Sequence, residues 1–554
     1  MRDMGGKGSA SRKVVVIGLD GATFDLISPW VEEGKLPAFG HLLEEGVWGE
    51  LRTVIPPLTP AAWSSFATGC NPGKHGMFDH LYRKEGTYRF SPVSSRLRGA
   101  RAIWRLLSEA GKSVGVMNLP TTYPPERVKG IMISGMYTPV SKESFTYPPS
   151  LYEELKREGW GYIHPGSAYS KNVSLELIED LHRCLQNRVD ILLYLLQRYD
   201  FDLFVAVLND TDVVQHRFWE FMEPASRGPA RFREAILGIY QEADRQLARV
   251  MQTLGGDTTL IVISDHGMGP LHHYLHLNNW LLHEGFLKLK GNSLTRLKYL
   301  LFQHHFTPKN LLRLLSTLRG KSTAKAIRVG KGGLARRLFL SFEDIDWLHT
   351  KAYSMGNVGQ IYINLKGREP QGIVERGPEY ERVREEIIER LYRLVEEDGS
   401  RLVGGLFRRE EIYWGEYLER APDIVFMPRH LEATAFGSYE FWSNTILERA
   451  EWFSGNHRMN GILLMKGEGI EKGKKIEGAR IIDLAPTILY LFGLPIPSGM
   501  DGKIVEGAFE EGYLASHLPR CREEEMTQEE REGGYTAEEE EEIAERLRSL
   551  GYLS

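Results

Sequence analysis

The sequence predicts an α/β protein with a doubly wound, largely parallel central sheet, helices on both faces of that sheet, and an inserted helical cap. Three observations lead to this prediction. Short β-branched runs alternate with amphipathic stretches along most of the 554 residues, which is the order of strands and covering helices in a parallel sheet. Three of the four clearest strands end in an aspartate, and one strongly basic segment interrupts the alternation.

The composition is that of a soluble globular protein. Hydrophobic residues make up 42% of the chain and charged residues 26%, both ordinary values. A net charge of −5 over this length gives no general attraction to nucleic acid or membranes, so no specific nucleic-acid partner is expected. The three cysteines are far apart and form no CxxC pair, which favours a reducing, cytoplasmic location.

The strands define where a catalytic core begins and ends. Residues 1–12 are polar and glycine-rich and are expected to form a flexible tail, and the following VVVIGL is too short for a signal peptide or a membrane span. The core is predicted to comprise residues 13–287 and 343–515. Because ligands of open α/β sheets bind beyond the carboxyl ends of the strands, aspartates at those ends mark a site. The clearest strands are VVVIGLD from Val14, FDLFVAVLND from Phe201, TTLIVISD from Thr258 and GILLMKG from Gly461.

A basic insertion, residues 288–342, is predicted to form a helical cap. Between Lys288 and Arg337 the chain has thirteen Lys or Arg and no Asp or Glu, with leucine-rich helical pieces between them. Two interpretations stay open. The segment is a solvated helical hairpin, or it is a basic amphipathic surface that faces anionic lipid or a phosphorylated substrate.

An acidic tail, residues 516–554, ends the chain. From residue 523 to residue 545, twelve Asp or Glu stand against a single arginine. Thr536 and Glu539 have the spacing of a capping box, which predicts a terminal helix. That helix should dock on the body or on a second subunit, without a catalytic role, and the oligomeric state stays open. Its narrow apolar stripe consists of Ile543, Leu547 and Leu550.

The stretch PPLTPAAWSSFATG predicts a helix that starts near Thr59, with Pro60 in its first turn and Gly69 at its end. Thr59 has two interpretations. It caps free backbone N–H groups, as threonine often does, or it is a nucleophile aimed at a phosphate, because helix N-termini attract anions.

Several carboxylates and histidines have ligand-like positions, although each is weak evidence alone. A strand-terminal aspartate such as Asp20 is usually a turn residue, and an adjacent Asp-His pair is common; the pair Asp79-His80 is interpreted as a surface pair. Asp212 and His216 are four apart, so on a helix both face one side. Taken in order, the chain supplies two three-residue sets of oxygen and nitrogen ligands and a hydroxyl: Asp20, Thr59, Asp212, His216, Asp265, His266 and His457.

This ordered set resembles the alkaline phosphatase superfamily and, within it, the type I phosphodiesterase and nucleotide pyrophosphatase branch. The resemblance extends from Val14 to about Gly493 and includes the late RIIDLAPTILYLFGLPIPSGMDGK. It implies Thr59 as the nucleophile and two divalent metal ions. One ion would be held by Asp20, Asp265 and His266 together with the Thr59 oxygen. The other would be held by Asp212, His216 and His457, and Asp212 is preferred to Asp210 because of its spacing to His216.

Mixed carboxylate and imidazole ligands suit zinc, with manganese as the alternative. The sequence also departs from the branch. Ala62 stands where nucleotide pyrophosphatases usually carry an asparagine that donates to the phosphate, so another donor is needed and nucleotide specificity stays open. Lys74 is either a phosphate contact or a surface lysine. Cys70 is similar to a sulfatase signature cysteine, but the final arginine is a lysine and the Thr-Gly pair precedes the cysteine, which disfavours a sulfatase.

The resemblance therefore implies hydrolysis of phosphodiester or nucleotide pyrophosphate bonds through a phosphothreonine intermediate. The expected substrate is a small phosphoester, nucleotide-like or a lipid headgroup. A phosphomonoesterase or phosphotransferase with the same nucleophile is the alternative. An alternative outside the enzymes is a binding module. Such a module would bind anionic lipid or RNA through its basic cap, with a structural metal site and peripheral membrane contact.

Overall fold

The computed structural model describes residues 12–139, 145–161, 173–223, 226, 228–319, 338–396, 399–437, 441–528 and 533–550. The predicted N-terminal tail, except for its last residue, and residues 320–337 of the predicted cap lie outside this part of the chain. Among the described helices, none combines the length and the apolar character needed to cross a bilayer.

A nine-stranded sheet forms the centre of the described structure. β1 pairs in parallel with β8 and β9, and β5 pairs in parallel with β8 and β6. β19, the predicted strand GILLMKG, instead runs antiparallel between β2 and β9. The prediction of a largely parallel sheet is confirmed, with β19 and the edge strand β7 as antiparallel members. In sheet order the strands are β20 (Lys474–Lys475), β2 (Val47–Arg52), β19 (Asn460–Lys466), β9 (Thr258–Ile263), β1 (Lys13–Leu19), β8 (Leu203–Leu208), β5 (Val114–Met117), β6 (Gly130–Ile133) and β7 (Thr146–Tyr147).

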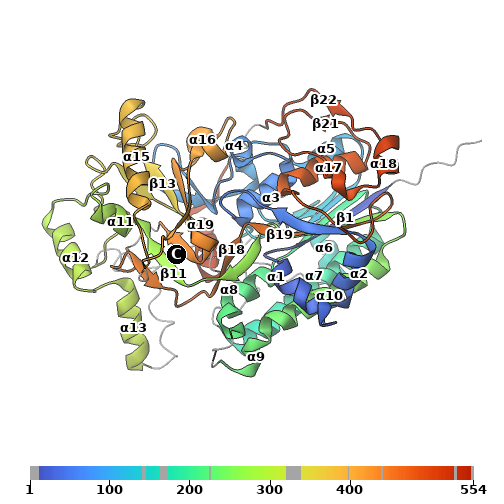
Figure 1. Ribbon diagram of the computed structural model, residues 1–554, viewed down its shortest axis with the longest axis horizontal. Helices are drawn as coiled ribbons and strands as arrows, with labels where there is room; N and C mark the ends of the chain where they lie inside the picture. The colour runs from blue at the N-terminus through green and yellow to red at the C-terminus, as the bar shows by residue number, and fades with distance from the viewer. Residues whose placement is uncertain are drawn as a thin grey trace, which may run out of the picture.

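Helices cover both faces of this sheet (Figure 1). Side chains of β1 alternate between two cores, with Val15 and Ile17 in one and Val14 and Val16 in the other. Buried strands with both faces apolar are typical of α/β proteins. Helices on the first face are α1 (Phe24–Glu32), α2 (Pro37–Glu45), α6 (Ser150–Arg157), α7 (Leu175–Arg198), α8 (Asp210–Met222) and α10 (Ala235–Thr253). Helices on the second face are α3 (Thr59–Thr68), α5 (Ile103–Glu109) and α17 (Leu484–Leu491).

A second lobe with its own hydrophobic core lies beside the sheet, on the left of Figure 1. Phe302 of the predicted cap belongs to this core together with Tyr353 and Ile363, so the cap helices are part of a larger lobe. Its sheets are β12 (Ala352–Ser354), β13 (Gln360–Ile363), β15 (Ile424–Pro428) and β14 (Val403–Arg408), and β16 (Ala433–Phe436), β11 (His273–His276) and β17 (Leu447–Arg449). Its longer helices are α11 (Leu277–His283), α12 (Ser293–Gln303), α13 (Pro308–Arg319) and α15 (Pro378–Leu391).

Smaller elements connect the lobes and the termini. β10 and β18 form an antiparallel ribbon that becomes important at the site. The smaller elements are α4 (Pro72–His75), β3 (Leu81–Arg83), β4 (Phe90–Pro92), α9 (Ala230–Arg233), β10 (Gly267–Pro270), α16 (Arg409–Ile412), β18 (Gly455–Arg458), β21 (Ile496–Pro497), α18 (Glu511–Ser516) and β22 (Cys521–Arg522).

The C-terminal helix α19 (Ala537–Leu550) docks on the body of the same chain. The predicted capping box is present, because the Glu539 carboxylate accepts from the Thr536 N–H at 2.8 Å and the Thr536 hydroxyl accepts from the Glu539 N–H at 3.3 Å. The predicted apolar stripe is buried in the first core. Arg546 donates to the carbonyls of Met136 and Thr138 at 2.8 and 2.7 Å, which ties the helix to the segment that carries Tyr137.

Candidate active site

The candidate site lies where β1, β8 and β9 end. Asp20 directly follows β1, and Asp265 and His266 follow β9 closely. Helix α8 begins two residues after β8 and presents Asp212 and His216 one turn apart. Because these three strands are parallel, their carboxyl ends meet at one edge of the sheet. The β10–β18 ribbon brings His457 to the same edge, opposite Met268.

One cluster consists of Asp20, Asp265, His266 and Thr59, all with no exposed surface. His266 Nε2 lies 3.5 Å from Asp20 Oδ1, 3.4 Å from Asp265 Oδ2 and 3.2 Å from Thr59 Oγ1. Ligand atoms of the two aspartates and the histidine all lie within 4.8 Å of one another. The structure thus brings together the residues assigned to the first predicted metal ion.

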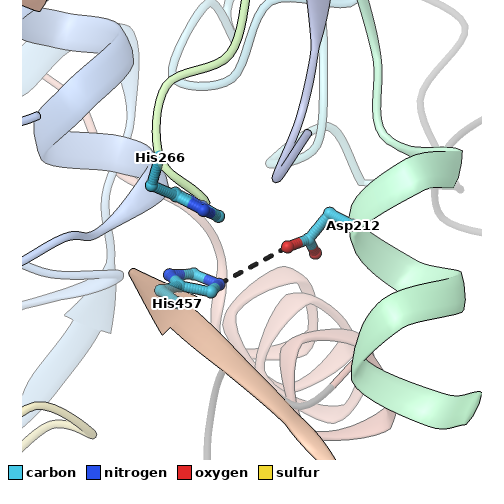
Figure 2. Close-up of side chains that lie close together, drawn as sticks. All are labelled: Asp212, His266 and His457. Atoms are coloured by element: carbon cyan, nitrogen blue, oxygen red, sulfur yellow. Dashed lines mark ion pairs between the residues drawn. The ribbon is translucent and has the colours of Figure 1, made fainter. Parts of the chain in front are cut away.

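A second cluster adjoins the first. Asp212 Oδ1 lies 3.4 Å from His216 Nε2 and 3.5 Å from His457 Nε2, and the two histidine Nε2 atoms are 3.0 Å apart. Figure 2 shows Asp212, His266 and His457 pointing toward one another from α8, the loop after β9 and β18. His266 stacks on His457 with 3.5 Å between ring centroids, so it lies between the two clusters. Asp210 is not part of this group and pairs with Arg188 at 2.7 Å.

Backbone carbonyls orient all three histidines. Nδ1 of His216, His266 and His457 lies 2.8, 3.1 and 2.8 Å from the carbonyl oxygens of Gly455, Gly267 and Pro57. Since a carbonyl only accepts a hydrogen bond, each Nδ1 carries the proton and each Nε2 presents a lone pair to the clusters. This is the arrangement of metal-ligating histidines, whose second nitrogen donates to an outer partner.

The buried carboxylates fit divalent metal ions. Asp20 Oδ1 and both oxygens of Asp265 have no hydrogen-bond partner among the residues that the structure describes. Burial and the charge of Asp20 raise the pKa of Asp265 well above its ordinary value, and burial and the charge of Asp212 raise the pKa of Asp20 to about 7. Such crowding of buried negative charge is unfavourable without a cation. Burial also lowers the pKa of His216 to about 4, which keeps that imidazole neutral for ligation.

Thr59 is not a helix cap. Helix α3 begins at Thr59 itself, the cap position belongs to Leu58, and no side chain caps the helix. The capping interpretation is therefore wrong, because the hydroxyl turns into the cluster instead. Gly69 ends the helix in the left-handed conformation, as predicted. A Cβ on Gly18 of β1 would lie 2.3 Å from Trp63 Cη2, so the glycine allows α3 to pack closely on β1.

Asp79 and His80 are not a surface pair. Their exposed fractions are 3% and 0%, because the second lobe and Tyr137 cover them, and Tyr137 Oη lies 2.8 Å from His80 Nδ1. His80 lines a cavity together with His216 and His457. The sequence offered no local signal for this burial, since Tyr137 lies 57 residues away. Asn357, a further wall residue of the same cavity, was missed for the same reason.

Lys74 lies away from the two clusters. Its ammonium group donates to Asp501 at 2.8 Å and to the Gly499 carbonyl at 2.9 Å. These bonds tie α4 to the late RIIDLAPTILYLFGLPIPSGMDGK segment and give Lys74 a structural role. Cys70, Cys184 and Cys521 are free thiols.

A doubly wound α/β sheet with two adjoining carboxylate and imidazole clusters and a buried hydroxyl defines a metal-dependent hydrolase. The chain belongs to the type I phosphodiesterase/nucleotide pyrophosphatase family, which it matches over residues 14–433. This match confirms the resemblance inferred from the sequence and establishes that the chain is a hydrolase. The family depends on metal ions. No curated protein sequence matches the chain.

Two solved structures show the same fold. Phosphonoacetate hydrolase from Sinorhizobium meliloti 1021, in complex with phosphonoformate, has a TM-score of 0.52 and 15% identity and covers 87% of this chain and 95% of its own. Murine ectonucleotide pyrophosphatase/phosphodiesterase 5 has a TM-score of 0.50 and 15% identity and covers 90% of this chain and 100% of its own. At this level of sequence identity, the similarity to the two structures shows a shared fold and nothing more.

Proposed function

We propose that this hydrolase cleaves phosphodiester or nucleotide pyrophosphate bonds, with Thr59 as nucleophile at a two-metal site. The observation that carries the proposal is the position of the Thr59 hydroxyl. It is buried in the first turn of α3 and lies 3.2 Å from His266 Nε2, at the edge of the first cluster. A structural threonine would have its hydroxyl bonded to the backbone of its own helix, as Thr68 does.

Two groups of residues would hold the metal ions. Asp20, Asp265 and His266 with the Thr59 oxygen form the first group, and Asp212, His216 and His457 form the second. Divalent cations bound there would lower the pKa of a coordinated hydroxyl and offset the negative charge of a phosphate. We propose zinc, because both groups mix carboxylate and imidazole ligands, and manganese is the alternative.

The chain's own residues define the chemical steps. Thr59 Oγ1 gives its proton to water and forms a bond to phosphorus, while the bond from phosphorus to the leaving oxygen breaks and that oxygen takes up a proton from water. Water then attacks the phosphothreonine, releases the phosphate product and restores the hydroxyl. The N-terminus of α3 supports the phosphate throughout, because its dipole and first-turn N–H groups favour an anion. Two in-line displacements retain the configuration at phosphorus.

Variants of Thr59 test this proposal. Thr59→Ala should reduce the release of p-nitrophenol from bis-p-nitrophenyl phosphate by roughly 10³-fold or more, and Thr59→Ser should retain part of it. Thr59→Ala should also keep most of the rise in melting temperature that zinc causes. Thr68→Ala, at the other end of α3, is the matched control and should stay active. Full activity of Thr59→Ala would exclude the nucleophile role.

The alternative activity is that of a phosphomonoesterase or phosphotransferase. The ratio of turnover on bis-p-nitrophenyl phosphate to turnover on p-nitrophenyl phosphate separates the two, since both substrates have the same leaving group. A ratio above one supports the diesterase. A ratio well below one assigns the site to monoesters, and a phosphorylated acceptor alcohol among the products indicates phosphotransfer.

We also propose that α12 contacts an anionic lipid surface. Leu294, Leu297 and Leu300 repeat every three residues and are 57%, 53% and 51% exposed, while Lys298 and Phe302 are buried on the other side of the helix. Residues 288–319 contain no Asp or Glu. Exposed leucines beside positive charge suit the interface of an acidic bilayer.

Vesicle sedimentation tests the lipid contact. The full-length protein should sediment with phosphatidylserine vesicles and not with phosphatidylcholine vesicles, and salt should weaken binding. A variant with Leu294, Leu297 and Leu300 changed to serine should stay in solution. Serine substitution of Leu518 is the control, because this residue is 76% exposed and follows α18, which lies at the opposite side of Figure 1 from α12. Equal sedimentation of the α12 variant would refute the contact, and salt-sensitive binding to RNA alone would assign the surface to nucleic acid.

A further inference from the structure

Two narrow cavities of about 30 and 20 Å³ adjoin the metal-ligand clusters, and Asn357 lines both of them. Their walls come from both lobes. The core contributes Pro57, Leu58 and His457, while the second lobe contributes Asn357 and Thr434. Side chains of the second lobe therefore form part of the wall beside the clusters.

The Asn357 amide is incompletely satisfied. The residue is 6% exposed, and its Oδ1 has no hydrogen-bond partner among the residues that the structure describes. A buried amide oxygen without a hydrogen-bond partner is costly. If the amide is flipped, its NH2 group takes the place of the oxygen and is the group without a partner instead. Groups of this kind are rare in folded proteins and call for an explanation.

The backbone around Asn357 is held in place, so the segment itself cannot easily shift to give the amide a partner. Gly356 exchanges two hydrogen bonds with Gly437, at 2.9 and 2.7 Å. Gly359 donates to the Ala435 carbonyl at 3.0 Å, and a Cβ at this glycine would lie 1.9 Å from the Phe426 carbonyl oxygen. The short segment from Gly356 to Gly359 is thus fixed on the two neighbouring strands, β15 and β16.

Contact between the lobes places this segment at the site. A Cβ on Gly356 would lie 1.9 Å from Asp79 Oδ2, so the segment lies directly on the buried residue next to His80. Asn357 and His80 consequently form part of the same cavity wall, beside His216 and His457.

We propose that Asn357 determines substrate specificity by forming a hydrogen bond with a hydroxyl group on the substituent that stays on the phosphate. This inference rests on the proposed function. The cavities touch Pro57 and Leu58, directly before Thr59, and in an in-line displacement the leaving group departs on the side opposite the nucleophile. A group beside Pro57 and Leu58 is therefore the retained substituent. The preferred substrates are diesters of a polyhydroxyl alcohol such as a sugar, a nucleoside or glycerol.

Two diesters with the same leaving group test the inference, namely p-nitrophenyl glyceryl phosphate and p-nitrophenyl propyl phosphate. They differ only in the two hydroxyls of the retained group. A site built to bond a hydroxyl discriminates against the analogue that lacks it, and the cost of an unpaired buried group corresponds to a preference in kcat/KM of roughly 5- to 150-fold for the glyceryl ester.

Asn357→Leu keeps the volume and removes both polar ends of the amide. It should bring the ratio of kcat/KM values close to one by slowing the glyceryl ester and leaving the propyl ester nearly unchanged. Thr434→Val changes another polar wall residue of both cavities and should retain the preference. Turnover of the propyl ester reports whether each variant is folded.

The outcomes separate the two proposals. Equal kcat/KM values for the two esters in the unmodified protein overturn the specificity inference and leave the proposed diesterase standing. A preference that persists in Asn357→Leu, or disappears in Thr434→Val, also overturns it. If neither ester is hydrolysed by the metal-loaded protein, the proposed function fails and this inference fails with it.

Discussion

Replacing Asp265 by asparagine should stabilise the metal-free protein and remove its stabilisation by metal ions. Both carboxylate oxygens of Asp265 are buried without a hydrogen-bond partner in the described part of the chain, and the neighbouring Asp20 repels them. Because the raised pKa makes the metal-free fold bind a proton that the unfolded chain releases, this carboxyl group costs about 3 kcal/mol or more near neutral pH. At roughly 2.1 cal/mol/K per residue, unfolding of 554 residues carries about 1.2 kcal/mol/K, so relief of that cost raises the melting temperature by about 2.5 °C.

Metal ions should close most of the gap between the two proteins. A ligand at 100 times its Kd stabilises the folded state by about 2.7 kcal/mol, so zinc should raise the melting temperature of the unmodified protein by about 2 °C and that of Asp265→Asn by much less. The assay is thermal unfolding in EDTA and in zinc. If Asp265→Asn melts below the unmodified protein in EDTA, or responds equally to zinc, Asp265 does not face a cation.

Asp423 offers a matched control, because its carboxylate is equally buried but has its negative charge balanced by neighbouring hydrogen-bond donors. Arg368 donates to both of its oxygens at 2.9 and 2.6 Å, and Tyr380 adds a bond at 2.8 Å. Although burial opposes ionisation, Arg368 keeps the pKa of Asp423 below its ordinary value. Asp423→Asn removes the carboxylate that accepts from two guanidinium nitrogens of Arg368, although Glu369 still accepts from Arg368 Nε at 2.9 Å. The substitution should cost about 3 kcal/mol in EDTA and in zinc alike.

Three further substitutions have expected outcomes. Gly18→Ala would place a Cβ 2.3 Å from Trp63 Cη2; overpacking should cost about 1–3 kcal/mol in thermal unfolding and reduce p-nitrophenol release, because α3 carries the proposed nucleophile. Burial raises the pKa of Asp79 from 3.8 to about 7, so the folded state binds a proton that the unfolded state releases, and stability falls as pH rises through this window. Asp79→Asn should lack that slope and be up to about 4 kcal/mol more stable at pH 8 in denaturant titrations. Arg546→Ala removes two bonds to the backbone around Tyr137 and should cost about 3 kcal/mol and raise KM, which steady-state kinetics would detect.

The sequence was sufficient for the fold class and for the set of carboxylates and histidines that the structure brings together. Strand-terminal aspartates become informative because parallel strands bring their carboxyl ends together, and the four-residue spacing of Asp212 and His216 directly encodes a shared helix face. The direction of β19 was not encoded in this way. Its side chains are apolar on both faces, so its pattern predicts a buried strand without saying which way it runs.

Features formed by distant contacts could not be predicted from local patterns. Asp79 and His80 are polar, and only the approach of Tyr137 and of a glycine in the second lobe buries them. Thr59 has the residue type and position of a cap, and its role changes because His266, 207 residues away, lies beside its hydroxyl. A single sequence gives spacing along the chain, and these contacts are long-range.

The contact between Gly356 and Asp79 connects the chemistry of the core with the second lobe. Gly356 has a φ of 99°, a conformation that few residues other than glycine adopt, and any Cβ there would meet the Asp79 carboxylate at 1.9 Å. A side chain at this position would therefore push the second lobe away from the core and widen the cavities beside His457. Because the proposed metal ligands all come from the core and the strands that hold Asn357 all come from the second lobe, such widening should weaken substrate discrimination before it weakens metal binding.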